Sequence, residues 1–171
     1  MLGVKVLRLG HRAGRDDRIS THVGLVARQY GAEEVVFCGQ HDSGMMESVR
    51  DVGERWGEGT EFRYSEDWRP EIRGFDGFTA HLTMYGLSLD EEVDRLRSKD
   101  LNDLQLVVGS EKVPREVYRY AELNLAVGHQ PHSEIAALAV TLDRIADIKR
   151  GFDDADIEVE PTDGEKRTRE L

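Results

Sequence analysis

Residues 127–145 read VGHQPHSEIAALAVTLDRI, which we interpret as a strand end, a short loop and a buried helix. Small and apolar residues recur after position 134 at helical spacing, over a broad arc. The loop before them, residues 128–134, holds two histidines, an amide, a hydroxyl and a carboxylate. A capping role for Ser133 and a first-turn role for Glu134 are ordinary. They leave the rest of the loop free for a ligand.

Strands alternate with helices along the rest of the chain. We expect strands at 4–9, 34–38, 61–64, 78–84, 104–108 and 124–127. We expect helices at 22–30 (capped by Ser20 or Thr21), 45–56, 68–74, 89–98, 114–121 and 132–149. This alternation predicts an α/β fold with a mainly parallel sheet flanked by helices. We expect a single domain over residues 1–150 and an acidic, flexible tail over 151–171, in which Ile157 and Val159 could support a short strand.

The composition describes a charged globular protein of 171 residues with a net charge of −11. Its 34 acidic residues face 23 basic ones, and we count only five lysines. This argues against a nonspecific nucleic-acid binder and supports the hypothesis of a salt-adapted source. No stretch reaches the roughly 18–20 apolar residues that span a bilayer, and the N-terminus lacks a signal-peptide pattern. We therefore expect a cytoplasmic protein without a membrane partner. Cys38, the one cysteine, is expected to be a small buried residue.

Positive charge gathers in one place. Residues 8–18 read RLGHRAGRDDR and hold four arginines against two aspartates. This loop, with Arg8, Arg12, Arg15 and Arg18, predicts a local basic spot on an acidic body.

Three unusual segments follow predicted strands: HLTMYG at 81–86, GSEKVP at 109–114 and GHQPHSE at 128–134. Because ligands of open α/β sheets bind beyond the carboxyl ends of strands, we expect these segments to line one pocket. Neither a phosphate loop nor a dinucleotide fingerprint is present. His129 and His132 are three apart, but no further residue completes a zinc set, so we expect no metal.

Three segments together, 7–32, 81–86 and 107–145, resemble the archaeal tRNA 2′-O-methyltransferase family that modifies cytidine 56 of the T-loop. The resemblance covers about residues 4–148 and leaves out the tail. That family belongs to the SPOUT superfamily. The resemblance implies a deep trefoil knot in the C-terminal part of the fold, a homodimer, tRNA as partner and S-adenosylmethionine as methyl donor.

The resemblance also implies the site residues. The donor would be held by Leu82, Gly109, Ser110, Glu111, Lys112, Val113, Val127, Gly128, His129, Gln130, Pro131, His132, Ser133 and Glu134. Position 129 is His where the family pattern has Asn, and an imidazole can still form a hydrogen bond. An arginine near the first strand–helix unit would assist the ribose 2′-hydroxyl. Arg18 is the first candidate, followed by Arg12 and Arg28, and the alternative is that all three only bind tRNA phosphate.

Other functions remain open. A SPOUT 2′-O-methyltransferase with a different RNA target fits the same motifs. A knotted RNA-binding protein without catalysis would have no need of a donor pocket. A dinucleotide-binding oxidoreductase is disfavoured because the glycine fingerprint is missing.

Overall fold

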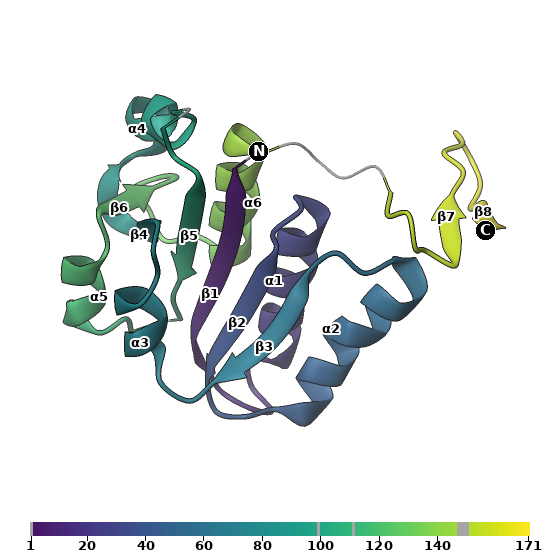
Figure 1. Cartoon of the computed structure of the whole chain (residues 1–171), viewed down its shortest axis with the longest axis horizontal. Coiled ribbons are helices and arrows are strands. Elements are labelled where there is room, and N and C mark those ends of the chain that lie inside the picture. The colour runs from purple at the N-terminus through teal and green to yellow at the C-terminus, as the bar shows by residue number, and fades with distance from the viewer. Residues whose placement is uncertain (1, 99, 111, 147–150) are drawn as a thin grey trace.

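The computed structural model describes residues 2–98, 100–110, 112–146 and 151–171. Six strands form one sheet in the order β3-β2-β1-β5-β4-β6, and every neighbouring pair is parallel (Figure 1). The strands are β1 Gly3–His11, β2 Glu34–Gly39, β3 Glu61–Ser65, β4 Phe78–Ser88, β5 Asp103–Val108 and β6 Leu123–Ala126. The predicted α/β architecture with a parallel sheet is confirmed.

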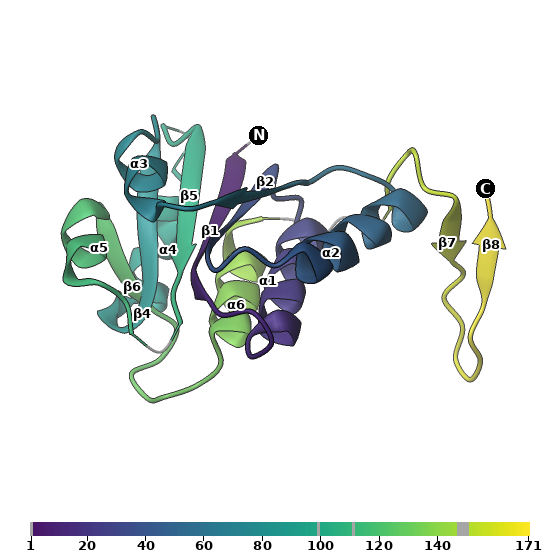
Figure 2. The ribbon, with the colours of Figure 1, turned by 90° about the horizontal axis from the view of Figure 1, so that it is seen from below.

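Helices cover both faces of the sheet. They are α1 Asp17–Gln29, α2 Ser43–Trp56, α3 Trp68–Arg73, α4 Leu89–Leu96, α5 Arg115–Tyr120 and α6 Glu134–Ile145. Helices α1, α2 and α6 pack side by side on one face, with α4 beside α6, whereas α3 and α5 lie together on the other (Figure 2). The loops beyond the carboxyl ends of β4, β5 and β6 therefore meet at one edge of the sheet, as parallel strands require.

The sheet is buried on both faces, which is why its strands are almost continuously apolar. In β1, Val4 and Val6 contribute to the larger core beneath α1 and α6. Leu7 and Leu9 contribute to the smaller core beneath α3 and α5. Cys38 lies in the smaller core, and burial raises the pKa of its thiol to about 12. The expectation of a small buried cysteine is confirmed.

Some element boundaries differ from the sequence-based expectation. Helix α1 begins at Asp17 rather than 22, so the expected cap Ser20 lies inside the helix and is buried. Strand β4 continues to Ser88 rather than ending at 84. Ser133 caps α6 as expected, because its hydroxyl accepts hydrogen bonds from the backbone N–H groups of the first turn. The expected end of that helix, 147–149, lies outside the described residues.

The C-terminal tail forms a two-stranded antiparallel sheet, of β7 Ile157–Val159 and β8 Thr168–Glu170. Figures 1 and 2 show it projecting beyond the end of α2. The tail also contacts the body, since the Phe152 ring lies 4.0 Å from the Arg28 guanidinium carbon. The short strand expected at Ile157 and Val159 is present, and a turn that contains Gly164, at φ 126, connects it to the second strand. The flexibility of the tail stays a prediction. The domain boundary at 150 falls outside the described residues and stays a prediction.

No helix among the described residues is long and apolar enough to cross a membrane. The trefoil knot stays a prediction of the family resemblance.

Candidate active site

The three predicted loops line one pocket with a volume of about 380 Å³. The expectation that segments 81–86, 109–114 and 128–134 converge is therefore confirmed. Ten of the expected donor-binding residues line the pocket: Leu82, Gly109, Ser110, Val113, Val127, Gln130, Pro131, His132, Ser133 and Glu134. Lys112, Gly128 and His129 lie outside its lining, and Glu111 lies outside the described residues.

A bulge in β4 shapes one wall of the pocket. Leu125 of β6 pairs with both Leu82 and Leu87, so residues 83–86 loop out of the ladder between them. Gly86 sits so close to β6 that a Cβ there would lie 2.4 Å from backbone atoms of Asn124. Only glycine allows this approach. The bulge turns Thr83, Met84 and Tyr85 toward the pocket.

His129 connects the last loop to this bulge. Its Nε2 donates a hydrogen bond to the backbone oxygen of Gly86 over 3.0 Å. The His129 side chain thus holds two pocket loops together, and its contact with the donor stays a prediction. An imidazole in place of an amide keeps a hydrogen-bond donor at this point.

The pocket wall changes character from one side to the other. Leu82, Leu125, Val127 and Ala137 give it an apolar side. On the polar side, the hydroxyls of Thr83 and Tyr118 lie 3.1 Å apart. Such a combination suits a molecule with a flat apolar ring and several polar groups.

Glu134 brings a negative charge to the pocket, and Arg8 stands behind it. Arg8 is buried, and its Nη2 lies 3.4 Å from Oε1 of Glu134, while Nη1 donates to the oxygen of Leu9. Burial lowers the pKa of Arg8, and the Glu134 carboxylate opposes that effect. The expectation that Arg8 belongs to an exposed basic spot was wrong, because position 8 shares the core-facing side of β1 with Val4 and Val6.

The three candidate arginines have different surroundings. Arg12 is bound to the buried Asp16, with Nε and Nη2 2.9 and 3.1 Å from its oxygens, and this hydrogen bonding lowers the pKa of Asp16. Arg18 is exposed at the first turn of α1 and lines a separate hollow of about 320 Å³. Arg28 is in the last turn of α1 and donates to the backbone oxygens of Trp56 and Gly57.

These surroundings order the candidates. Helix α1 follows the carboxyl end of β1 and runs back along the sheet, so its last turn lies at the edge opposite the pocket. Within one chain, Arg28 is therefore remote from the pocket, whereas Arg18 and Arg12 lie at the pocket's edge of the sheet. Desolvation lowers the pKa of Arg28, which fits a structural role in holding residues 56–57 and the tail.

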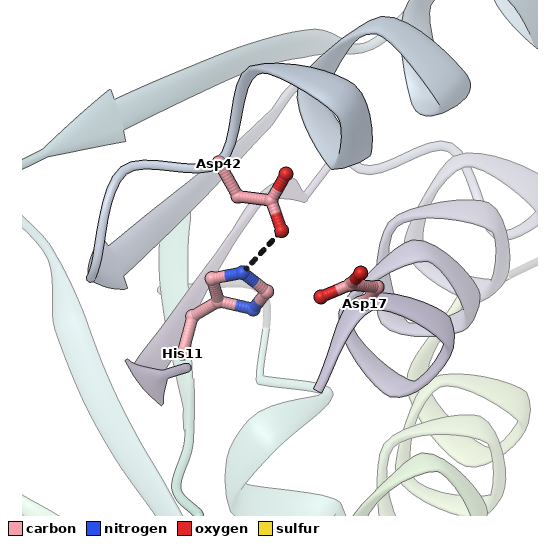
Figure 3. Close-up of side chains that lie close together, drawn as sticks. All are labelled: His11, Asp17 and Asp42. Atoms are coloured by element: carbon pink, nitrogen blue, oxygen red, sulfur yellow. Dashed lines mark hydrogen bonds and ion pairs between the residues drawn. The ribbon is translucent and has the colours of Figure 1, made fainter. Parts of the chain in front are cut away.

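His11 organises the start of the arginine loop (Figure 3). Its Nδ1 lies 2.7 Å from the Ser20 hydroxyl, and its Nε2 lies 3.1 Å from Oδ2 of Asp42. Together with Asp17, these side chains place three possible metal-ligand atoms within 4.8 Å of one another. Asp42 also accepts a hydrogen bond from Met45 N–H, and Asp17 accepts one from Gly14 N–H, so protein contacts hold both carboxylates in place. This cluster was not predicted from the sequence, because its three residues come from separate segments of the chain.

The comparisons with known proteins decide the family. The model of the family described as tRNA ribose 2′-O-methyltransferase, aTrm56, matches residues 56–169. The chain belongs to this family. The match includes most of the tail, which the sequence resemblance had left out. A relative also aligns over nearly the whole chain: a protein of Archaeoglobus fulgidus is 51% identical over 96% of this chain and 96% of its own length.

The other relatives have the same name. Proteins of Thermococcus kodakarensis (45% identical) and Methanocaldococcus jannaschii (48% identical) each align with 98% of this chain and 97% of their own length. All three relatives are named tRNA (cytidine(56)-2′-O)-methyltransferase.

Solved structures share the fold at low identity. The SpoU methyltransferase AviRb from Streptomyces viridochromogenes, in complex with AdoMet, has a TM-score of 0.54 at 13% identity, over 84% of this chain and 57% of that one. A structure concerned with the 2-OH methylation of C/U34 on tRNA has a TM-score of 0.60 at 15% identity, over 84% and 93%. The expected SPOUT-type architecture is confirmed.

Proposed function

We propose that this chain methylates the ribose 2′-hydroxyl of cytidine 56 in the T-loop of tRNA, with S-adenosylmethionine as methyl donor. The observation that carries the proposal is identity of 45–51% over nearly the whole chain with the three relatives that bear this name. The pocket formed by the three loops supports it independently, because a binding module alone would have no use for such a pocket.

The pocket fits the donor. Its apolar side, with Leu82 and Val127, can take an adenine ring, and the backbone of Gly109 in the lining can form hydrogen bonds with the ring's polar edge. The carboxylate of Glu134 complements a ligand with a positively charged sulfur and ammonium group. Ten of the fourteen residues implied by the family resemblance lie in this lining. We propose all fourteen as donor-binding residues.

When bound, S-adenosylmethionine supplies a methyl group on a positively charged sulfur. The protein has to bring a ribose oxygen to that group in line and to manage the oxygen's proton. We assign the orientation of the ribose and its phosphate to Arg18, with Arg12 second, since both lie at the pocket's edge of the sheet. Arg28 is the third candidate, and its contacts with Trp56 and Gly57 make it the weakest.

An acidic protein must then bind an acidic polymer. The loop with Arg12, Arg15 and Arg18 gives a local cationic surface beside the pocket. The charge of Arg12 is partly offset there, because Arg12 forms an ion pair with Asp16. Salt weakens phosphate contacts steeply. In the concentrated salt of a salt-adapted source, phosphate contacts would therefore contribute little. Recognition of the folded RNA by shape and by hydrogen bonds then has to contribute much of the affinity.

We also propose that the protein is a cytoplasmic homodimer. Tyr85 and Leu87 are 75% and 55% exposed beside the pocket, and Val140 on α6 is 39% exposed. A second subunit would remove these large apolar groups from water. Analytical sedimentation at micromolar protein concentration measures the oligomeric state directly. A monomer at all concentrations tested would contradict the proposed dimer.

The test of the function is incubation with labelled S-adenosylmethionine and an unmodified tRNA transcript, followed by mapping of the methylated nucleotide. We expect label at cytidine 56 and none in a transcript that carries 2′-deoxycytidine at that position. Label at another nucleotide would favour the alternative RNA target. Absence of any transfer, with tRNA still bound, would favour the non-catalytic RNA-binding protein.

Replacing each arginine by alanine separates the two arginine roles. For a residue that orients the ribose, we expect a larger loss in kcat than in tRNA affinity. For a residue that only binds phosphate, tRNA affinity falls and the rate at saturating tRNA is kept. Arg69→Ala serves as the matched control, since Arg69 is exposed on α3.

A further inference from the structure

One polar side chain of the pocket is left unsatisfied. His81, on β4, is fully buried and belongs to the pocket lining. Its Nε2 is buried, and among the described residues it has no hydrogen-bond partner. A buried polar atom without a partner is costly, and a ligand that supplies the partner recovers that cost.

The hydrogen bonds around His81 determine which ring nitrogen holds the proton. The amide nitrogen of Asn124 donates to the backbone oxygen of Tyr118 over 3.0 Å. The amide oxygen of Asn124 therefore faces Nδ1 of His81, 2.9 Å away, and Nδ1 must be the donor. In the neutral ring, Nε2 is then an acceptor with a free lone pair.

The surroundings keep the ring neutral and fixed. The His81 ring packs edge-to-face against the Tyr118 ring, with the centroids 4.7 Å apart. Desolvation lowers the pKa of His81, which favours the uncharged form. The ring is therefore held in one tautomer and one orientation before any ligand arrives.

Resting on the proposed function, we propose that His81 Nε2 accepts a hydrogen bond from a hydroxyl or amino group of the methyl donor. Asn124 acts as a positioning residue, because it fixes the tautomer that makes Nε2 an acceptor. A second histidine of the pocket, His132, lacks this arrangement: it is exposed, and its Nδ1 donates to the oxygen of Ser133.

Two substitutions separate the roles of the two ring nitrogens. His81→Asn keeps an amide nitrogen near the position of Nδ1 and removes the acceptor at Nε2. His81→Gln places an amide oxygen near the position of Nε2. By calorimetry with S-adenosylmethionine, we expect His81→Asn to bind about three- to tenfold more weakly than the unaltered protein, the loss of one hydrogen bond. We expect His81→Gln to recover part of that loss, and thermal unfolding shows that both variants are folded.

A direct observation uses nitrogen NMR of the histidine rings in the unaltered protein. Without ligand, we expect His81 Nε2 to resonate as an unprotonated nitrogen and to shift upfield when S-adenosylhomocysteine saturates the pocket. An unchanged Nε2 signal at saturation, or equal donor affinity in folded His81→Asn, would overturn the role of His81 and leave the proposed function intact. Failure of the unaltered protein to bind the donor at all would overturn both.

Discussion

The guanidinium of Arg8 and the carboxylate of Glu134 lie 3.4 Å apart, although 126 residues separate them in the chain. Arg8 comes from the central strand β1, and Glu134 begins α6 at the rim of the pocket. The pair connects the buried core to the loop that we assign to donor binding. A guanidinium buried in this way is costly when its partner is removed.

We predict that Glu134→Gln lowers the free energy of unfolding by about 1–2 kcal/mol, because the neutral amide no longer offsets the buried charge of Arg8. The side chain of Glu134 is 32% exposed, so the effect is smaller than for a fully buried pair. Urea unfolding measures it. The same change in an Arg8→Met background should cost clearly less, and equal costs in both backgrounds would show that the two residues do not interact. Glu160→Gln on the exposed tail is the control.

Gly86 supports a second prediction. A Cβ at this position would lie 2.4 Å from backbone atoms of Asn124 and Leu125, which cannot rotate away. Gly86→Ala should therefore lower stability by about 1–3 kcal/mol and weaken donor binding by separating β4 from β6. Gly53→Ala is the matched control, because a Cβ there meets no atom within 4 Å in α2. It should raise stability by about 0.5–1 kcal/mol. A tolerated Gly86→Ala would mean that the bulge can move.

The position of the pocket could be predicted from the sequence, but its details could not. Strand ends of a parallel sheet meet at one edge, so the three polar loops had to converge once the strands were recognised. Arg8 was misplaced because its charge suggested the surface. Arg8 follows Val4 and Val6 at a spacing of two residues, which places all three on the same core-facing side of the strand. This spacing could have been used to predict that Arg8 is buried. The bulge at 83–86 depends on how closely two backbones approach, which no local pattern encodes.

His81 and the tail show the two kinds of omission. His81 lies between Ala80 and Leu82 in a strand of a sheet that is covered on both faces, so its burial could be predicted. Its free nitrogen, however, depends on Asn124, which comes from another strand. The tail was different, because Pro161, Asp163 and Gly164 are ordinary turn residues between two short strands. Their charged surroundings concealed that pattern.

Salt dependence tests the hypothesis of a salt-adapted source. With a net charge of −11, the folded chain repels itself, and screening should stabilise it. Ordinary screening is nearly complete at about 0.2 M salt, where the Debye length is below about 10 Å. We predict a continued rise in the free energy of unfolding as KCl increases into the molar range, measured by urea unfolding. A flat response above about 0.2 M would contradict the hypothesis.

The ion cluster around Glu71 in α3 makes part of the fold's stability depend on pH. Arg63 donates to both Glu71 oxygens over 2.8 and 2.7 Å, and Lys5 lies 3.2 Å away. This hydrogen bonding lowers the pKa of Glu71 to about 2, from an ordinary value of 4.5. Because the folded-state pKa is below the unfolded value, Glu71 contributes stability above about pH 4.5 and loses it as the pH falls toward about 2.

We therefore predict that Glu71→Gln is less stable than the unaltered protein at neutral pH and loses less stability on acidification through this window. Urea unfolding at neutral pH and near pH 3 measures both quantities. Glu47→Gln, at an exposed position of α2, should keep the full acid sensitivity. If Glu71→Gln lost as much stability as the unaltered protein over the same interval, the acid response would have to come from other carboxylates.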